Sequence, residues 1–359
     1  MQRSHLAGHR LRLGITNVGF WVLAACTGLY WIVNEPVVAP DALQCIGIAI
    51  GAIAAQSVFD YIGGVTLMPE PRPTTMTFLR VWSRGLLGHT LVVAAVGVAS
   101  AVSLRFTGGF GAAIVLVMSA LALGRRRLLR AIGGAEITER AYGGAMILTA
   151  TAGDPAFTGA VLGLGRHARS LVPARWMDTL PASELAVESS RRRWQIESAL
   201  PARSFVLLLL WNLMGAFIGA RVLDLADQSL AVALLGHACW MTLWAFVSLL
   251  VLPALSQTAV FAADRAAADQ GLDPRAWITH FPDLVGEDGS PRTGVQTIFY
   301  PIPSAERRLR HLDGPAPGFV PGDLARNNLY YSWATFTLLG RAVHCNVGRP
   351  VLWVIPPSA

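Results

Sequence analysis

The chain has 359 residues, of which 53% are hydrophobic and 14% are charged, and its formal net charge is +7. An average soluble domain has about 25% charged residues, so this composition excludes an ordinary soluble protein and predicts an integral membrane protein. All 29 basic residues are arginine. This excludes P-loop nucleotide sites and lysine Schiff-base chemistry, because both require a lysine.

Six segments are long and apolar enough to cross the core of a bilayer, which takes about 20 residues of helix. They are residues 15–34, 44–66, 86–104, 106–124, 204–223 and 230–252. The predicted fold is therefore a mainly α-helical membrane protein with about six transmembrane helices, and the lipid bilayer is its first partner.

The loops between these segments alternate in charge. Arginines gather at residues 1–12, 72–84 and 125–127, whereas acidic residues follow the first and fifth spans. Because basic flanks stay on the cytoplasmic side, we expect both termini and both large polar regions in the cytoplasm, with the spans in a bacterial cytoplasmic membrane. Because the arginines lie beside apolar spans, membrane topology accounts for the net positive charge of the chain, and no nucleic-acid partner is expected.

The first span permits a second interpretation. Leu23-Ala24-Ala25-Cys26 matches the lipobox of a bacterial lipoprotein signal. The residues that follow it remain apolar, however, where a lipoprotein would begin a polar tether. We therefore predict an uncleaved membrane anchor.

The remaining cysteines indicate no metal or disulfide chemistry. Cys45, Cys239 and Cys345, like Cys26, show no CxxC spacing. A disulfide framework or a zinc knuckle is not expected from such a pattern. We predict that all four are structural thiols.

These features divide the chain into five parts. Four spans are followed by a polar region, two further spans, a second polar region and an apolar tail. The parts are residues 1–124, 125–203, 204–253, 254–327 and 328–359.

Short patterns predict secondary structure inside the two polar regions. Apolar runs at 145–152 and 170–173, separated by a glycine-rich stretch, are typical of strands. Helices are predicted at 181–199, 258–270 and 304–312, where helical patterns follow proline or polar N-terminal residues.

The apolar tail is too short and too polar to predict as a span. Arg341 and His344 interrupt it, and Tyr330, Tyr331 and Trp333 precede them. Aromatic side chains gather at headgroup depth in membrane proteins, so we expect an interfacial or re-entrant helix here.

Four motifs occur in a fixed order between residues 150 and 312. They are Asp154-Pro155-Ala156-Phe157, Leu180-Pro181-Ala182-Ser183-Glu184-Leu185, Val260-Phe261-Ala262-Ala263-Asp264 and Pro303-Ser304-Ala305-Glu306-Arg307-Arg308-Leu309. The ordered set, with two spans between the second and third motifs, resembles the integral-membrane zinc metallopeptidases of the HtpX and CAAX-prenyl-protease type. The resemblance implies a small α+β cytoplasmic peptidase-like domain, built from both polar regions.

The resemblance fails at the zinc-binding HExxH motif of that family. Aligned without a gap, Arg191 and Gln195 stand at the two histidine positions and Arg192 at the catalytic glutamate. Shifted by one helical turn, Val187, Glu188 and Arg191 stand there, which keeps a carboxylate as base but supplies no ligand. Arginine retains its proton in proteins, so it neither ligates a cation nor acts as a base.

The later motif lacks a ligand as well. Val260 stands at the position of the third ligand, four residues before Asp264, and Ile302 replaces a later histidine. A catalytic zinc site needs three protein ligands. The resemblance therefore implies a catalytically inactive relative with no metal and no other cofactor.

Other ionisable side chains in the polar regions were weighed as a site. His167 and His280 with Glu184 and Glu188 could form a displaced metal site, but neither of these two histidines makes an i, i+4 pair with another His or a Cys. We expect instead that Glu188 forms i, i+3 and i, i+4 ion pairs with the following arginines on a solvated helix face.

Three polar residues fall inside predicted spans. Asp60, Asn212 and His237 are candidates for an ion or proton pathway, because polar groups are costly in the membrane. Only Asp60 is acidic, so we expect contacts between packed helices instead. Gly47-x-x-x-Gly51 and Gly215-x-x-x-Gly219 fit the same interpretation, since small residues allow close helix approach.

The sequence thus predicts a catalytically inactive, metallopeptidase-like membrane protein that acts as a binding or scaffold subunit. Its expected partner is another membrane protein or a peptide segment. Two alternatives are an active membrane zinc metalloendopeptidase with non-standard ligands and a small transporter.

Overall fold

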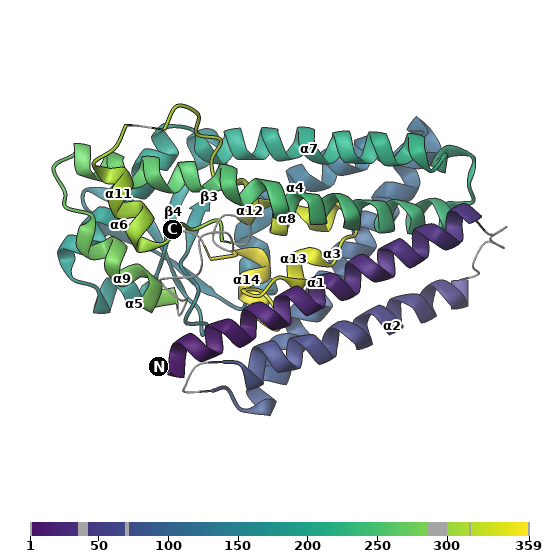
Figure 1. Ribbon diagram of the computed structural model, residues 1–359, viewed down its shortest axis with the longest axis horizontal. Coiled ribbons are helices and arrows are strands. Elements are labelled where there is room, and N and C mark those ends of the chain that lie inside the picture. The colour runs from purple at the N-terminus through teal and green to yellow at the C-terminus, as the bar shows by residue number, and fades with distance from the viewer. Residues whose placement is uncertain (1, 35–41, 69–71, 286–299, 316, 358–359) are drawn as a thin grey trace.

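The computed structural model describes residues 2–34, 42–68, 72–285, 300–315 and 317–357. The described chain is mostly helical and carries one small mixed sheet at one end (Figure 1). Five of its helices are long and apolar enough to cross a membrane. They are α1 (Gln2–Asn34), α2 (Ala42–Tyr61), α3 (Thr75–Thr107), α7 (Leu200–Val222) and α8 (Leu230–Asp269).

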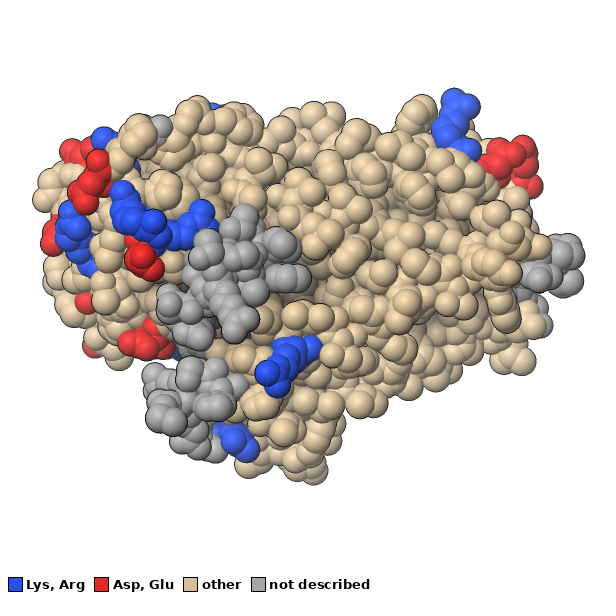
Figure 2. Space-filling view, viewed as in Figure 1, with Lys and Arg blue, Asp and Glu red and all other residues tan. Residues whose placement is uncertain are grey.

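The surface reflects this division into a membrane part and a polar end. Figure 2 shows charged side chains gathered at the sheet-bearing end and at the opposite tip, with a broad uncharged band between them. Many apolar side chains in that band face outward, among them Leu23, Val98 and Leu210. An exposed apolar band between charged ends is what a lipid-facing surface requires.

The sixth predicted span, 106–124, falls on α4 (Gly111–Ala131). This helix ends in Arg125, Arg126, Arg127 and Arg130, and it is not among the five helices that meet the length and composition of a span. Its side chains at Ile114, Met118, Leu121 and Leu129 are buried in the protein core. A count of six spans therefore stays a prediction.

Helix α8 corrects the expected division between a span at 230–252 and a separate helix at 258–270. The structure has one continuous helix of 40 residues, with Pro253 inside it. Proline removes the backbone hydrogen bond to the carbonyl of Leu249, four residues earlier, and long membrane helices tolerate such a loss. The helix therefore joins the membrane part to the sheet-bearing end without a break.

The sheet has four strands in the order β1-β2-β4-β3. Strands β2 (Ala145–Thr151) and β4 (Arg169–Pro173) pair in parallel at its centre, which confirms the two predicted strands. Strands β1 (Glu136–Tyr142) and β3 (Ala160–Leu162) pair antiparallel with β2 and β4 respectively, and form the two edges. Neither edge strand was predicted.

Four short helices cover this end of the molecule (Figure 1). They are α5 (Ala174–Thr179), α6 (Ala182–Glu197), α9 (Arg275–Val285) and α11 (Ala305–Leu312). Trp176, Trp277 and Phe281 pack edge to face between them, with ring centroids 5.3 to 6.4 Å apart. Helices α6 and α11 confirm the predictions for 181–199 and 304–312. The sequence also predicts a loop rich in Gly, Asp and Pro at 283–294, and most of it lies outside the described residues.

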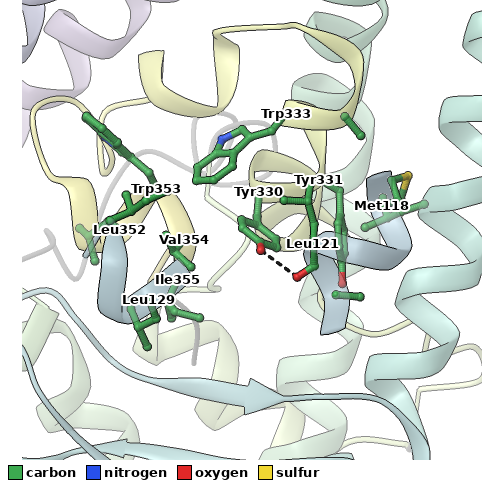
Figure 3. Close-up of a cluster of buried hydrophobic side chains, with 14 of the residues drawn as sticks. Met118, Leu121, Leu129, Tyr330, Tyr331, Trp333, Leu352, Trp353, Val354 and Ile355 are labelled. Atoms are coloured by element: carbon green, nitrogen blue, oxygen red, sulfur yellow. Dashed lines mark hydrogen bonds between the residues drawn. The ribbon is translucent and has the colours of Figure 1, made fainter. Parts of the chain in front are cut away.

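The C-terminal segment corrects the expected interfacial tail. It forms short helices, α12 (Leu324–Tyr331), α13 (Leu339–Ala342) and α14 (Pro350–Val354), in the middle of the molecule. Tyr330 and Trp333 are buried in the main core with residues of α4 and α14 (Figure 3), and the Tyr330 hydroxyl donates to the carbonyl of Leu121 at 2.9 Å. These aromatic side chains pack against protein, where headgroup contact was expected.

The glycine pair of α7 brings this helix close to α8. A Cβ atom on Gly215 would lie 2.6 Å from the indole of Trp244, and one on Gly219 would overlap Trp240. The Trp240 indole donates to the Gly215 carbonyl at 2.7 Å. Close helix approach is therefore confirmed for this pair. On α2, by contrast, a Cβ atom added at Gly47 or Gly51 would have no neighbour within 4 Å, so this glycine pair makes no close helix contact.

Candidate functional site

The motif positions on α6 are buried charged residues. Glu188, Arg191 and Arg192 are 1 to 3% exposed. Both predicted ion pairs form, with Arg191 Nη1 2.7 Å and Arg192 Nε 2.6 Å from the two oxygens of Glu188. The expected solvated face is wrong, because this side of α6 packs against α8 and the sheet. A surface pair would contribute little to stability, whereas a buried pair must be kept complete.

Asp264 of α8 joins the same cluster. Its carboxylate receives a bidentate pair of hydrogen bonds from Arg308 of α11, both at 2.7 Å. Arg191 Nε lies 2.8 Å from the same carboxylate. The guanidinium of Arg191 thus lies between the carboxylates of Glu188 and Asp264. Residues of the third and fourth motifs thus meet the part of α6 that follows the second motif.

Arg192 connects the cluster to the sheet. Its Nη1 donates to the carbonyl of Leu171 on β4, and its Nη2 donates to the carbonyl of Thr158, both at 2.7 Å. Gly159 lies beside it at φ +77°, and a Cβ there would collide with the Leu171 carbonyl. Only glycine fits this close approach, which fixes the turn before β3 against α6.

We define the arginine cluster as Glu188, Arg191, Arg192, Asp264 and Arg308. It contains three cations and two anions, so it carries an excess positive charge in the protein interior. Burial alone would lower the pKa of Arg191, but the charges of Asp264 and Glu188 outweigh burial and raise it. A guanidinium group only donates hydrogen bonds, and both carboxylates of the cluster lie against these donors.

Gln195 and Val260, the remaining motif positions, lie at a separate small cavity. This cavity of about 70 Å³ is also bordered by Ala160 and Val161 of the edge strand β3. We call it the edge-strand cavity. Its polar lining residues are Arg125, Gln195, Ser204, Ser256, Asp323 and Asn327.

Asp323 is an acidic residue in the lining of the edge-strand cavity, and its pKa is shifted from the ordinary value. Burial raises the pKa of Asp323, although the nearby charges of Arg326 and Arg125 oppose the shift. The opposite wall is built by Arg125, which donates to Asn327 at 2.9 Å. A polar cavity with hydrogen-bonding groups and a perturbed acid is typical of a binding site.

The alternative metal site of His167, His280, Glu184 and Glu188 does not form. His280 Nδ1 contacts Glu184 at 2.8 Å, and Glu188 is bound within the arginine cluster. His167 is next to Arg166 instead, 3.3 Å from its Nε. Across the described ranges, no three His, Cys, Asp or Glu side chains are grouped to hold a metal ion.

Asp60 of α2 forms a second buried polar network with the tail. Its carboxylate lies 2.6 Å from Arg341 and accepts from the backbone N–H of Gly348 at 2.9 Å. Gln56 and Trp82 also donate to it, each at 3.0 Å. These partners lie on α2 itself, on α3 and in the tail, as expected for a packing role.

The other two membrane candidates have different partners. Asn212 donates to the Leu208 carbonyl of its own helix at 2.8 Å. His237 stacks on Phe110 with ring centroids 3.9 Å apart, and neither ring nitrogen has a hydrogen-bond partner among the described residues. Asp60, Asn212 and His237 therefore do not form one polar pathway through shared contacts.

Sequence reasoning missed two further partners. Arg308 was visible in the last motif but was not assigned a role, and its spacing to Asp264 gives no local signal. Arg349 Nε donates to Asp154 Oδ2 at 2.6 Å, across 195 positions of sequence. Burial alone would raise the pKa of Asp154, but Arg349 and the Ala156 amide outweigh this and lower it. The first motif is thus held by the C-terminal segment.

No family profile, curated protein or solved structure matches the chain.

Proposed function

We propose that the chain is a catalytically inactive, metallopeptidase-like integral membrane protein that acts as a binding or scaffold subunit. The observation that carries the proposal is the position of the Arg191 guanidinium between Glu188 and Asp264. The cation that these carboxylates face is a side chain of the protein itself. Such a centre stabilises the packing of α6, α8 and α11, and it supplies no group to activate water.

The proposal keeps the relationship to HtpX- and CAAX-prenyl-protease-type peptidases. Its support is spatial, because two of the four ordered motifs contribute residues to the arginine cluster. Asp264 of the third motif and Arg308 of the fourth meet there with the part of α6 that follows the second motif.

The proposed ligand is an extended peptide segment, contributed by another membrane protein. Among the residues that the structure describes, strand β3 pairs with β4 alone, and its residues Ala160 and Val161 border the edge-strand cavity. An extended segment can add to such an edge through backbone hydrogen bonds. Polar groups around Asp323 would hold a polar side chain of that segment.

The proposed location is a bacterial cytoplasmic membrane, with the sheet-bearing end in the cytoplasm. Arginines at both the start of α1 and the end of α4 support this orientation. Figure 2 shows the charged residues concentrated at that end.

The catalytic part of the proposal is tested on detergent-purified full-length protein. Elemental analysis after exhaustive dialysis is expected to find no bound zinc, and added zinc is expected to produce no cleavage of an unfolded protein substrate. The Glu188→Gln variant should match wild type in both assays. Zinc near one equivalent, or cleavage abolished by Glu188→Gln, would overturn the assignment.

The binding part needs a different readout. A photo-crosslinking amino acid at Val161 on β3 is expected to capture a peptide segment in membranes, whereas one at Thr138 on β1 is not. Both positions are on edge strands, so the pair separates a specific site from general edge exposure. Equal capture at both positions, or none at Val161, would contradict a ligand at β3.

A further inference from the structure

A second cavity lies between the sheet and the C-terminal half of α6. It has a volume of about 350 Å³ and is bordered by the β1–β2 hairpin, by the start of β4 and by residues of α6 from Ser189 to Glu197. We call it the hairpin cavity. None of its described lining residues belongs to the arginine cluster, borders the edge-strand cavity or lies on a helix long enough to span a membrane. A ligand there would therefore be separate from the proposed peptide site.

The hairpin cavity follows from the way α6 covers the two central strands. Ile147 and Val172 of these strands pack with Leu185 of α6 in one apolar cluster. Near the starts of the same strands the side chains are small, with Ala145 on β2 and Ala168 just before β4. The later turns of α6 have no large side chain to pack against there, so a space remains between helix and sheet.

The charged residues of the hairpin cavity carry a net positive charge. Arg169, Arg193 and Glu197 line it, and none of the three forms an ion pair with another described residue. Arg169 Nη1 donates to two backbone carbonyls of its own segment, and Arg193 Nη2 donates to the Gly143 carbonyl at 3.4 Å. Two guanidinium groups and one carboxylate thus leave an excess of one positive charge for a ligand.

Two serine hydroxyls in the wall of the hairpin cavity add further donors. Ser170 is 9% exposed and Ser189 is half-buried. Their Oγ atoms are buried and have no hydrogen-bond partner in the described parts of the chain. Buried hydroxyls normally have a partner, and a change of serine rotamer would turn either group toward a bound oxygen atom. The cavity therefore favours a ligand that is rich in acceptors.

The remaining wall of the hairpin cavity is apolar. Met146 and Ile196 border it near the arginines, and Met146 is 57% exposed. The cavity is within the range of pockets for small organic molecules, about 300–1,000 Å³, and exceeds the needs of a single inorganic anion. Arginine presents a planar fork of donors that matches the oxygens of a phosphate group. The lining thus suits a phosphate that is attached to a small organic group.

We propose that the hairpin cavity binds a phosphate ester, whose phosphate group is held by Arg169 and Arg193 and whose organic part lies against Met146 and Ile196. The site is independent of the peptide-binding role. Because Arg169 belongs to β4 and Arg193 to α6, the bound phosphate would fasten the helix of the arginine cluster to the sheet. A soluble phosphate ester and a phospholipid head group offer the same chemistry, and the test separates these two sources.

The first test measures binding to full-length protein purified in a phosphate-free detergent. Glycerol 3-phosphate is titrated by calorimetry, and retention of phosphatidylglycerol is followed by native mass spectrometry. Arg193→Gln is expected to weaken binding about 10- to 100-fold, because it removes a charged hydrogen-bond donor. Arg140→Gln is the matched control and should bind as wild type does, since Arg140 is an exposed arginine of the same sheet that pairs with Asp178 outside the cavity.

The second test uses the sign of the charge. Glu197→Gln removes the acidic residue of the described lining, so it should tighten binding of glycerol 3-phosphate. Weaker binding by this variant would overturn an anion as the ligand. Binding of glycerol 3-phosphate supports a soluble ester, whereas retention of phosphatidylglycerol alone supports a lipid head group. Failure of wild type to bind either probe, or equal binding by Arg193→Gln and Arg140→Gln, would overturn the site.

Discussion

The carboxylate of Asp60 on α2 and the guanidinium of Arg341 in the C-terminal segment lie 2.6 Å apart, although 281 positions separate them in sequence. Both side chains are buried, and Arg341 also lies over the ring of Trp353 at 4.0 Å. This ion pair holds the C-terminal segment against α2, and Asp60 also accepts a hydrogen bond from Trp82 of α3. It connects regions that share no local sequence pattern.

Replacing Asp60 with Asn should destabilise the protein strongly. The change leaves Arg341 buried without a counter-charge, and breaking a buried pair in this way costs about 3–5 kcal/mol. The thermal midpoint of the detergent-purified protein measures the effect. Asp60→Leu combined with Arg341→Met is expected to lose less stability than Asp60→Asn, because it removes both charges. An unchanged midpoint for Asp60→Asn would exclude a structural role.

Asp264→Asn should be similarly damaging at the sheet-bearing end. It leaves Arg191 and Arg308 facing a neutral amide in a buried site, with an expected loss of about 3–5 kcal/mol. Glu184→Gln is the control at the same end of the molecule, because its partner His280 is 40% exposed. That change should cost about 1 kcal/mol or less. Equal losses would mean that the arginine cluster is no more important than a surface pair.

The stability of the protein should fall with decreasing pH partly because of His344. The folded state holds its pKa at about 3, below the ordinary value of 6.5, so the unfolded chain binds a proton first. This contribution is complete above pH 6.5 and is lost progressively as the pH falls toward 3. His344→Gln should unfold with a flatter pH dependence in that interval, measured as thermal midpoints. Parallel profiles for the two proteins would contradict the buried, neutral imidazole.

Gly219→Leu should separate α7 from α8. The new side chain would overlap Trp240, and overpacking of this kind costs about 1–3 kcal/mol. Gly51→Leu, on the exposed face of α2, provides the comparison because nothing lies within 4 Å of its built Cβ. The thermal midpoint should fall for the first variant alone. A comparable fall in both variants would contradict a specific packing role for Gly219.

Local signals in the sequence were enough to predict several elements. The apolar runs of β2 and β4 and the N-terminal residues of α6 and α11 are complete within a few positions. Pro253 misled the interpretation of α8, because proline ends most helices in water but is tolerated in a long membrane helix. Strand β1 was missed because most of its side chains are exposed and carry no alternation.

The site was predictable only as a set of positions. Glu188 and its two arginines lie on one helix, so spacing alone gave their pairing. Burial of that pairing depends on Asp264 of α8 and Arg308 of α11. Both lie 72 or more positions later in the sequence than the residues of α6. No period or composition encodes such a contact. The same holds for Asp154 and Arg349, and for the tail that fills the core.

The contact between Asp60 and Arg341 also has a consequence during synthesis. At a translation rate of about 10 residues per second, Arg341 leaves the ribosome on the order of half a minute after Asp60. Throughout that interval the second helix must enter the membrane with an acidic group whose final partner does not yet exist. A helper that shields the nascent helix would meet this need. Residues that are made late therefore complete a helix that is inserted much earlier.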